Sequence, residues 1–331
     1  MVYAVLLLLV GFAILIFGAD FLVNGASSVA KKNGISNLAI GLTVVAFGTS
    51  MPELIVSLVS ALDGKPDASF GNVIGSNNFN LLFILGVAGL IYPLVVQRNT
   101  VKYEVPLSLL AAGIVFLVVN DSTLFGSSEN GPAQNILGRF DSIILLVFFG
   151  GFLLYIYRTM RTASDLGEGE PIKLYSTSMS IGMVVLGLVM LVGGGELVVD
   201  SAIKIAQHFG LSEKLIGLTI LAAGTSLPEL ATSCVAAYRK NTDIAIGNVI
   251  GSNIFNIFFI LGVTGLVSPI PYNTAMNFDL YVLMASTILL MIFMFTLNSR
   301  KLDRWEAFLM LMAYFAYTIY LVSTDVPVPI Q

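Results

Sequence analysis

The sequence has little charge and few of the side chains on which most enzymes and metalloproteins depend. It contains one cysteine and one histidine in 331 residues, and only 11% of its residues are charged. Since a soluble domain carries about 25% charged residues, this composition argues against a soluble protein. The single Cys234 cannot form an intramolecular disulfide. The single His208 excludes a histidine-rich metal site and a catalytic histidine repeated in both halves of the chain.

Long apolar runs take the place of the missing charge. Hydrophobic residues make up 56% of the chain, and the mean hydropathy is +0.90. Runs of about 18 or more apolar residues recur, which is the length that crosses a bilayer as a helix, whereas the alternation of a membrane β-barrel is absent. Residues 1–20 lack the basic start and the cleavage site of a signal peptide. We therefore expect them to remain as the first helix of an all-α, multi-pass protein of the cell membrane.

Ten transmembrane helices are predicted from the apolar segments that charged or turn residues separate. Lys and Arg concentrate in cytoplasmic connections, and here twelve of the 16 fall on one side when each is assigned to its nearest connection. That side is predicted to be cytoplasmic. Both termini are then extracellular, in agreement with an even number of spans. The expected spans are 2–29, 36–62, 69–93, 102–120, 141–160, 174–206, 214–238, 243–269, 278–298 and 304–323.

Two motifs occur twice, and both copies are separated by the same distance. The sequence GTSMPE at 48–53 returns as GTSLPE at 224–229, and GNVIGSN at 71–77 returns unchanged at 247–253, a shift of 176 positions (229 − 53 = 176). Five predicted helices precede each return, and an odd number turns the second copy upside down in the membrane. Inverted repeats with a site at their interface are a recurrent plan among secondary transporters. The expected division is 1–160 for the first repeat, 161–173 for a cytoplasmic linker and 174–331 for the second repeat.

The first motif should break a helix and expose oxygen atoms. Pro52 has no N–H and disfavours helical geometry before it, so we expect free backbone carbonyls near Ala46 and Thr49. Non-helical backbone at membrane depth is tolerated only where it is buried in protein or lines a cavity. With the hydroxyls of Thr49 and Ser50 and the carboxylate of Glu53, these carbonyls form the all-oxygen set that Na⁺ and Ca²⁺ prefer. The second copy repeats the side chains with Thr225, Ser226 and Glu229.

A helix cap is the alternative interpretation of the same motif. Ser50-Met51-Pro52-Glu53 fits the S-x-x-E capping box. A charged residue at the centre of a membrane helix costs about 2.5–3.5 kcal/mol on insertion scales, and serine alone can cap a helix. The cap therefore does not explain the glutamate, and ion binding is favoured, although the two roles can coexist.

The second motif adds hydroxyl and amide groups. Ser76 and Asn80 are four residues apart and share a helix face that can point toward Glu53, and Ser252 and Asn256 repeat the arrangement. We expect these four side chains to line the site. Their neighbours Asn77 and Asn253 lie one residue off that face and are expected to be structural, and the glycines of the motif fit close helix packing.

With these residues identified, the chain resembles the sodium/calcium exchangers of the calcium/cation antiporter superfamily, in their short prokaryotic form. The resemblance covers essentially the whole chain and is carried by residues 41–80 and 217–256, which hold the duplicated motifs. It implies two inverted five-helix halves, four cation sites at mid-membrane, and electrogenic exchange of Na⁺ for Ca²⁺ by alternating access.

The resemblance also implies the ligands. Glu53 and Glu229 would hold Ca²⁺ with the carbonyls of Thr49 and Thr225, and Asn80 and Asn256 would line the middle position. The two Na⁺ sites would be formed, respectively, by Ser50, Ser76 and the carbonyl of Ala46, and by Ser226, Ser252, the Thr225 hydroxyl and the carbonyl of Ala222.

Other functions remain as alternatives. Proton-coupled relatives that carry Ca²⁺ or another divalent ion place an acid and a histidine shortly after Gly-Asn, where this chain has Gly-Ser-Asn. A cation channel could use the same oxygens, and an intramembrane serine hydrolase at Ser50 or Ser226 would lack a base. We expect no enzymatic activity, no cofactor and no nucleic acid partner. The expected partners are Ca²⁺ and Na⁺ as substrates and the lipid bilayer, around a functional monomer.

Overall fold

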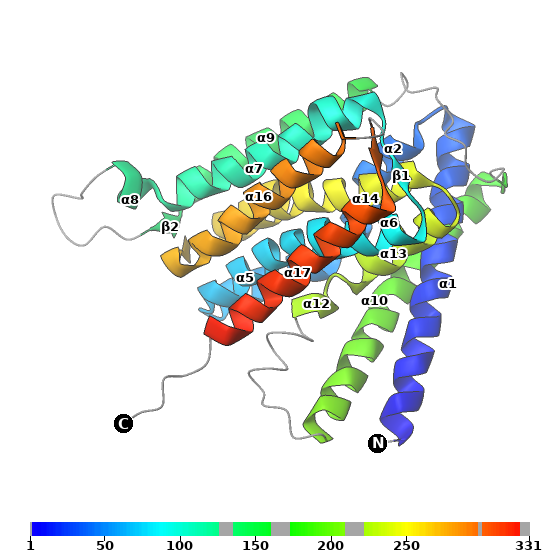
Figure 1. Ribbon diagram of the computed structural model, residues 1–331, viewed down its shortest axis with the longest axis horizontal. Coiled ribbons are helices and arrows are strands. Elements are labelled where there is room, and N and C mark those ends of the chain that lie inside the picture. Colours follow the sequence, from blue (N-terminus) through cyan, green and yellow to red (C-terminus); the bar gives the residue numbers. More distant parts are fainter. Residues whose placement is uncertain (1, 126–134, 160–172, 209–221, 297–299, 325–331) are drawn as a thin grey trace.

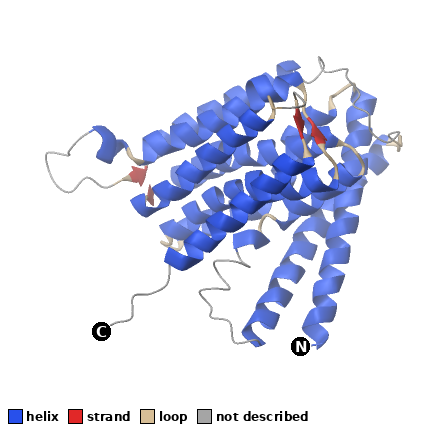
Figure 2. Ribbon diagram, viewed as in Figure 1, coloured by secondary structure: helices blue, strands red, loops and turns tan. Residues whose placement is uncertain are grey.

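The computed structural model describes residues 2–125, 135–159, 173–208, 222–296 and 300–324. These residues are overwhelmingly helical (Figure 2). Within them, eight helices are long and apolar enough to cross a membrane, and a ninth candidate span is a helix pair bent by 45° between Thr49 and Met51. The nine candidates match nine of the ten predicted spans. The remaining one, 214–238, lies partly outside the described residues.

The first part of the chain contains five predicted spans and two short strands. Its elements are α1 (Val2–Asn33), α2 (Asn37–Ile40), the π-helical η1 (Gly41–Val45), α3 (Ala46–Thr49), α4 (Met51–Leu62), α5 (Pro66–Asn78), the π-helical η2 (Phe79–Ile84), α6 (Leu85–Ile91), β1 (Leu94–Val95), the π-helical η3 (Thr100–Glu104), α7 (Val105–Val119), α8 (Asp121–Phe125), β2 (Ile136–Leu137) and α9 (Arg139–Thr159).

The second part repeats much of this order. Its elements are α10 (Thr177–His208), α12 (Ala222–Gly224), α13 (Leu227–Tyr238), α14 (Thr242–Ile254), the π-helical η5 (Phe255–Leu261), α15 (Gly262–Val267), β3 (Ile270–Pro271), the 3₁₀ turn η6 (Thr274–Met276), α16 (Asn277–Phe293), β4 (Lys301–Leu302) and α17 (Arg304–Thr324). As Figure 1 shows, α1 begins and α17 ends toward the same side of the molecule.

The two helical runs that carry the GNVIGSN motif form the centre of the molecule. The candidate spans differ in burial over the most apolar 18-residue window of each. The buried share is 72% in the run 66–91 and 94% in the run 242–267, against 17–39% in the other long helices. Polar side chains in these two runs therefore face protein, where charged and polar groups of membrane proteins are tolerated. Each run passes into a π-helical segment directly after its motif, and such segments are frequent at functional sites.

Two small antiparallel pairings join the two parts of the chain. β1 pairs with β4, and β2 pairs with β3. In each case the strand that follows the central helix of one part pairs with the strand that precedes the last helix of the other. Two strand pairings therefore join the two parts of the chain, and each part contributes one strand of each kind.

Helices α1 and α10 pack along each other and are inclined to the rest of the bundle (Figure 1). Gly11, Gly18 and Gly25 recur every seven residues on α1, and a Cβ atom on any of them would lie 2.8–2.9 Å from an atom of α10. Gly187 and Gly194 are the corresponding close-packed glycines on α10. Small residues permit this close approach between membrane helices, so the long apolar helices have a specific partner in each other.

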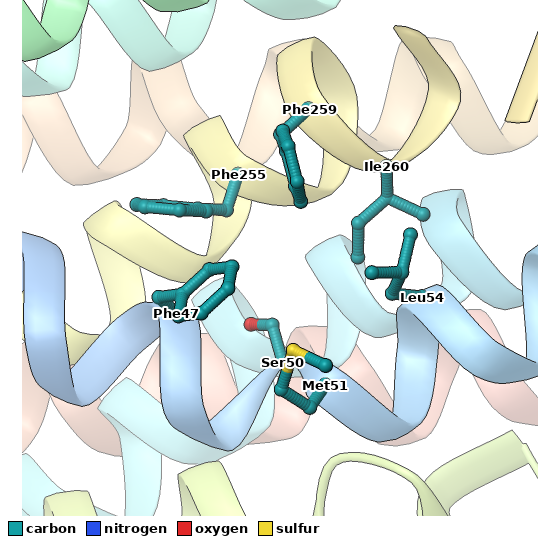
Figure 3. A pocket seen from close by; sticks show the side chains of 7 residues that line it. All are labelled: Phe47, Ser50, Met51, Leu54, Phe255, Phe259 and Ile260. Atoms are coloured by element: carbon teal, nitrogen blue, oxygen red, sulfur yellow. The ribbon is translucent and has the colours of Figure 1, made fainter. Parts of the chain in front are cut away.

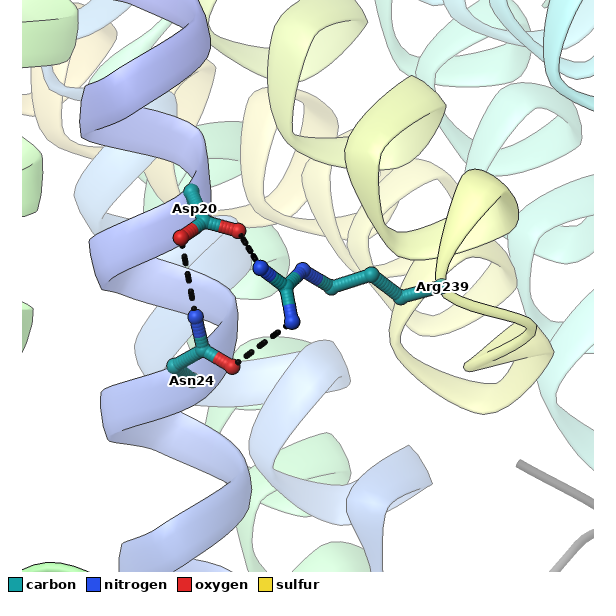
Figure 4. Close-up of polar contacts among 3 residues, drawn as sticks. All are labelled: Asp20, Asn24 and Arg239. Carbon is teal, nitrogen blue, oxygen red and sulfur yellow. Dashed lines mark hydrogen bonds and ion pairs between the residues drawn. The ribbon is translucent and has the colours of Figure 1, made fainter. Parts of the chain in front are cut away.

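The turn after α13 is attached to α1 by polar contacts (Figure 4). Arg239 forms an ion pair with Asp20 and donates a hydrogen bond to Asn24 Oδ1 at 3.2 Å. Asn24 in turn donates to Asp20 Oδ2 at 3.0 Å. The corresponding residues on α10, Glu196 and Asp200, are exposed. The attachment of α1 therefore distinguishes the two parts of the chain.

The close packing of α1 against α10 gives the first prediction. A Cβ atom on Gly187 would lie 2.7 Å from the Gly18 carbonyl oxygen and the Leu22 nitrogen, whereas none of the neighbouring atoms comes within 4 Å of one on Gly182 in the same helix. Gly187→Val should destabilise the protein by about 1–3 kcal/mol, as overpacking typically does, and Gly182→Val should not. Thermal unfolding of the purified variants in detergent measures this, and equal melting temperatures would contradict it.

Candidate cation site

The predicted helix break is confirmed at Ser50. This residue lies between α3 and α4 with φ −85° and ψ 7°, outside the helical region, and Pro52 is the second residue of α4. Ser226 has nearly the same conformation, φ −90° and ψ 8°, before α13. Because proline cannot donate to the preceding turn, the helical path is interrupted at this point in both copies, with a bend of 45° in the first, and Ser50 and Ser226 are buried inside the molecule.

The serines do not cap their own helices, so the capping-box interpretation is wrong. Neither Ser50 nor Ser226 makes a side-chain capping bond. Instead, Ser50 Oγ donates to Glu229 Oε1 at 2.8 Å, and Ser226 Oγ donates to Glu53 Oε1 at 2.9 Å. Each glutamate is held by the serine of the other copy of the motif. Two carboxylates 176 positions apart are thereby brought together in the interior, each with 0% exposure.

Four asparagines form a second set of contacts between the central helices. Asn77 and Asn253 each donate to the other's backbone carbonyl at 3.2 Å. Asn80 donates to Asn253 Oδ1 at 3.0 Å, and Asn256 donates to Asn77 Oδ1 at 2.9 Å. Asn77 and Asn253 thus join the two central helices. Asn80 and Asn256 use their amide nitrogens in these bonds, and their amide oxygens remain available.

Five oxygen atoms of the predicted ligands are buried and have no hydrogen-bond partner. They are Glu53 Oε2, Glu229 Oε2, Asn80 Oδ1, Asn256 Oδ1 and Ser76 Oγ. A buried carboxylate without a counter-charge is expensive, and neither glutamate forms an ion pair with Lys or Arg in the part of the chain that the structure describes. Buried carboxylate, amide and hydroxyl oxygens without donors are groups that an oxygen-liganded cation would satisfy.

The remaining predicted ligands have mixed outcomes. Ser252 Oγ donates to Glu229 Oε1 at 3.3 Å, so it lies beside a carboxylate as expected. The Ala46 carbonyl was expected to be free, but it accepts the Ser50 N–H at 3.0 Å and the Thr49 hydroxyl at 3.3 Å. The turn remains closed at that point because Ser50 leaves the helix only after its own N–H has bonded. Ala222 begins α12.

An apolar recess lies on one flank of the site (Figure 3). Ser50 is its one polar lining residue, with Phe47, Met51, Leu54, Phe255, Phe259 and Ile260 as the others. Phe47 is 43% exposed. The aromatic side chains therefore separate the Ser50 hydroxyl from the surface on this flank, which favours a dry environment for the carboxylates.

The sequence interpretation did not single out Asn72 and Asn248. Asn72 Nδ2 donates to the Glu53 carbonyl at 3.0 Å, and Asn248 Nδ2 donates to the Glu229 carbonyl at 3.3 Å. Their amide oxygens accept from Thr225 and Thr49, respectively. The signal was present, because both residues follow the first glycine of the duplicated motif. Spacing alone could not show that they reach the other half of the chain.

The fold and the site define a multi-pass helical membrane protein with a buried oxygen cluster at the contact between its two parts. A sequence profile of the family described as "Sodium/calcium exchanger protein" matches residues 3–158 and 179–323. The chain belongs to this family, which is a family of membrane transporters and not of enzymes.

Individual relatives agree with the family assignment. The chain is 38% identical to inner membrane protein YrbG of Escherichia coli over 81% of each chain. It is 33% identical to the sodium/calcium exchanger MaX1 of Methanosarcina acetivorans over 96% of this chain and 97% of that protein. Among solved structures, the sodium-calcium exchanger NCX_Mj superimposes with a TM-score of 0.78 at 31% identity, covering 99% of this chain and 100% of that one.

The hydrogen bonds among the four asparagines Asn77, Asn80, Asn253 and Asn256 give the second prediction. Asn77→Leu has a similar shape but leaves the Asn256 amide nitrogen and the Asn253 carbonyl without their partners. Each buried polar group left unsatisfied costs about 1–3 kcal/mol, so this variant should unfold at a distinctly lower temperature than wild type. Ser69→Ala on the same helix is the control, because the Ser69 hydroxyl is buried and has no partner to lose. An equal decrease in melting temperature in both variants would show that the asparagine hydrogen bonds do not stabilise the protein.

Proposed function

We propose that this protein exchanges Na⁺ for Ca²⁺ across the cell membrane by alternating access, electrogenically, with three Na⁺ moved for one Ca²⁺. The observation that carries the proposal is the set of five unpartnered buried oxygens, one of them on Glu53 and one on Glu229. The names of MaX1 and NCX_Mj, both sodium/calcium exchangers, support the same pair of ions.

The ligand assignment that we propose is the one implied by the family resemblance. Glu53 and Glu229 hold Ca²⁺ at the centre with the carbonyls of Thr49 and Thr225, and Asn80 and Asn256 direct amide oxygens to the middle position. The flanking Na⁺ sites use, respectively, Ser50, Ser76 and the carbonyl of Ala46, and Ser226, Ser252, the Thr225 hydroxyl and the carbonyl of Ala222.

Charge explains why the protein exchanges ions and does not leak them. Two glutamates contribute two negative charges, which one Ca²⁺ balances, or two to three Na⁺ ions with neutral ligands around them. An empty, doubly charged site is costly to carry through an apolar barrier, so only loaded states change sides. Because both cargoes use the same oxygen atoms, binding of one displaces the other.

The architecture follows from the same proposal. Residues 1–160 and 174–331 form two inverted repeats of five helices, joined by a cytoplasmic linker at 161–173, with ten spans in total and both termini extracellular. The site lies where the two repeats meet, and one chain contains every ligand, so the protein works as a monomer. The reciprocal contacts Ser50–Glu229 and Ser226–Glu53 support this division.

Coupling to Na⁺ is preferred over coupling to protons for a local reason. The site presents hydroxyls, amides and two carboxylates, and Gly-Asn is followed by Gly-Ser-Asn in both copies, without an acid or a histidine. The deciding experiment is radiolabelled Ca²⁺ uptake into proteoliposomes under outward gradients of Na⁺, K⁺ or H⁺ in turn. Uptake driven by Na⁺ alone and stimulated by an inside-positive potential is expected, because an excess of positive charge leaves the vesicle. Uptake driven only by H⁺ would establish the proton-coupled alternative, and flux without any counter-ion would indicate a channel.

The third prediction concerns the central carboxylate. Glu53→Gln removes a charge while conserving shape, and Na⁺-driven Ca²⁺ uptake should fall by roughly 100-fold or more, since unbalancing a buried charge interaction costs several kcal/mol. The matched control is Glu104→Gln, because Glu104 is also buried, at 2% exposure, but bonds to Tyr155 away from the site. Persistent uptake by folded Glu53→Gln protein would remove Glu53 from the ligand set.

A further inference from the structure

Two asparagines outside the assigned ligand set bridge the two halves beside the glutamates. Asn72 on α5 donates through Nδ2 to the Glu53 carbonyl at 3.0 Å and to Ser57 Oγ at 2.8 Å. Asn248 on α14 repeats both contacts with the Glu229 carbonyl at 3.3 Å and Ser233 Oγ at 3.0 Å. Each amide nitrogen is therefore fully engaged within its own half.

These contacts determine the direction of each amide. A backbone carbonyl can only accept a hydrogen bond, so the group that faces Glu53 must be the amide nitrogen of Asn72. The amide oxygen then faces the opposite way, where it lies 3.2 Å from Thr225 Oγ1. In the other copy, Asn248 Oδ1 lies 3.1 Å from Thr49 Oγ1. An amide oxygen also can only accept, so in both pairs the threonine hydroxyl is the donor.

The direction of the hydroxyl hydrogen decides what the threonine offers to a cation. A hydroxyl has one hydrogen and two lone pairs. Thr225 directly precedes Ser226, whose Oγ donates to Glu53 Oε1 at 2.9 Å, and Thr49 directly precedes Ser50, whose Oγ donates to Glu229 Oε1 at 2.8 Å. Thr49 has a second acceptor besides Asn248, the Ala46 carbonyl at 3.3 Å, whereas Asn72 Oδ1 is the acceptor of Thr225 among the described residues. Without Asn72, the single hydrogen of Thr225 would be able to point at the carboxylate, and a cation there would meet hydrogen in place of a lone pair.

We propose that Asn72 and Asn248 are positioning residues of the cation site: each accepts the hydrogen of a threonine from the opposite half and so turns that hydroxyl's lone pairs toward the cation. This inference rests on the proposed function, because it concerns the same site. It assigns the two asparagines a role in ion affinity in addition to their role in joining α5 to α12 and α14 to α3.

The fourth prediction uses a double-mutant cycle on the Asn72–Thr225 pair. Asn72→Leu should raise the Na⁺ concentration that half-saturates exchange by about tenfold, the size expected for one hydrogen-bonded ligand, while the maximal rate changes much less. Thr225→Val removes the hydroxyl itself and should have a similar effect. The double variant should be no worse than the more affected single one, because both changes remove the same oriented hydroxyl.

Two further variants separate positioning from packing. Ser57→Ala deletes one partner of Asn72 but leaves its contacts to Glu53 and Thr225, so its half-saturation for Na⁺ should equal that of wild type. The pair Asn248→Leu and Thr49→Val repeats the cycle in the other half. If Asn72→Leu does not fold, Thr225→Val carries the same expectation against Thr225→Ser, which keeps a hydroxyl and should retain affinity.

The outcomes distinguish this inference from the proposed function. Suppose that the wild-type protein exchanges Na⁺ for Ca²⁺. The positioning role alone is then overturned if the effects of Asn72→Leu and Thr225→Val are additive, or if Asn72→Leu leaves the half-saturation for Na⁺ unchanged. Wild-type protein that shows no Na⁺-driven uptake overturns the proposed function. In that case, the affinity for Na⁺ or Ca²⁺ can be measured by calorimetric titration of the purified wild type, the two single variants and the double variant. Equal affinities of wild type and both single variants in the titration would again reject the role of Asn72.

Discussion

The reciprocal bonds between serine and glutamate are the interaction on which the rest of the structure depends. Ser50 holds Glu229 and Ser226 holds Glu53, so neither half can place its carboxylate without the other. Two buried carboxylates so close together repel each other, and each loses its hydration. The two serine hydroxyls supply each carboxylate with a donor on one oxygen, and the other oxygen of each carboxylate is left without one.

The hydrogen-bond donors around this site are arranged so that acceptor atoms remain unused. The asparagines spend their amide nitrogens on backbone carbonyls and on one another, and the threonines direct their hydrogens at Asn72 and Asn248. The amide oxygens of Asn80 and Asn256 and one carboxylate oxygen of each glutamate consequently remain without a donor. The same bonds join the broken helices to the central helices. The two helical runs that carry the GNVIGSN motif are also the most deeply buried of the long candidate helices in the described chain.

Much of this arrangement could be predicted before the structure. The apolar runs indicated the spans, the duplicated motifs indicated two related halves, and Pro52 indicated the broken helix, since each of these follows from local properties of the chain. The capping box was also a local pattern, and it was wrong, because the Ser50 side chain is directed at Glu229 in the other copy of the motif and accepts no N–H of its own helix. Asn72 and Asn248 were missed for the same reason: their partners Thr225 and Thr49 are distant in sequence.

The sequence by itself determined that this is a helical membrane protein, where its helices run and break, and which oxygen-bearing side chains lie in the membrane, because hydropathy and backbone chemistry act over a few residues. Only the tertiary structure decided which oxygens meet, which are consumed by donors and which stay free. Those outcomes depend on the directions of hydrogen bonds between helices, and a direction in space is not encoded in the spacing of residues along a chain.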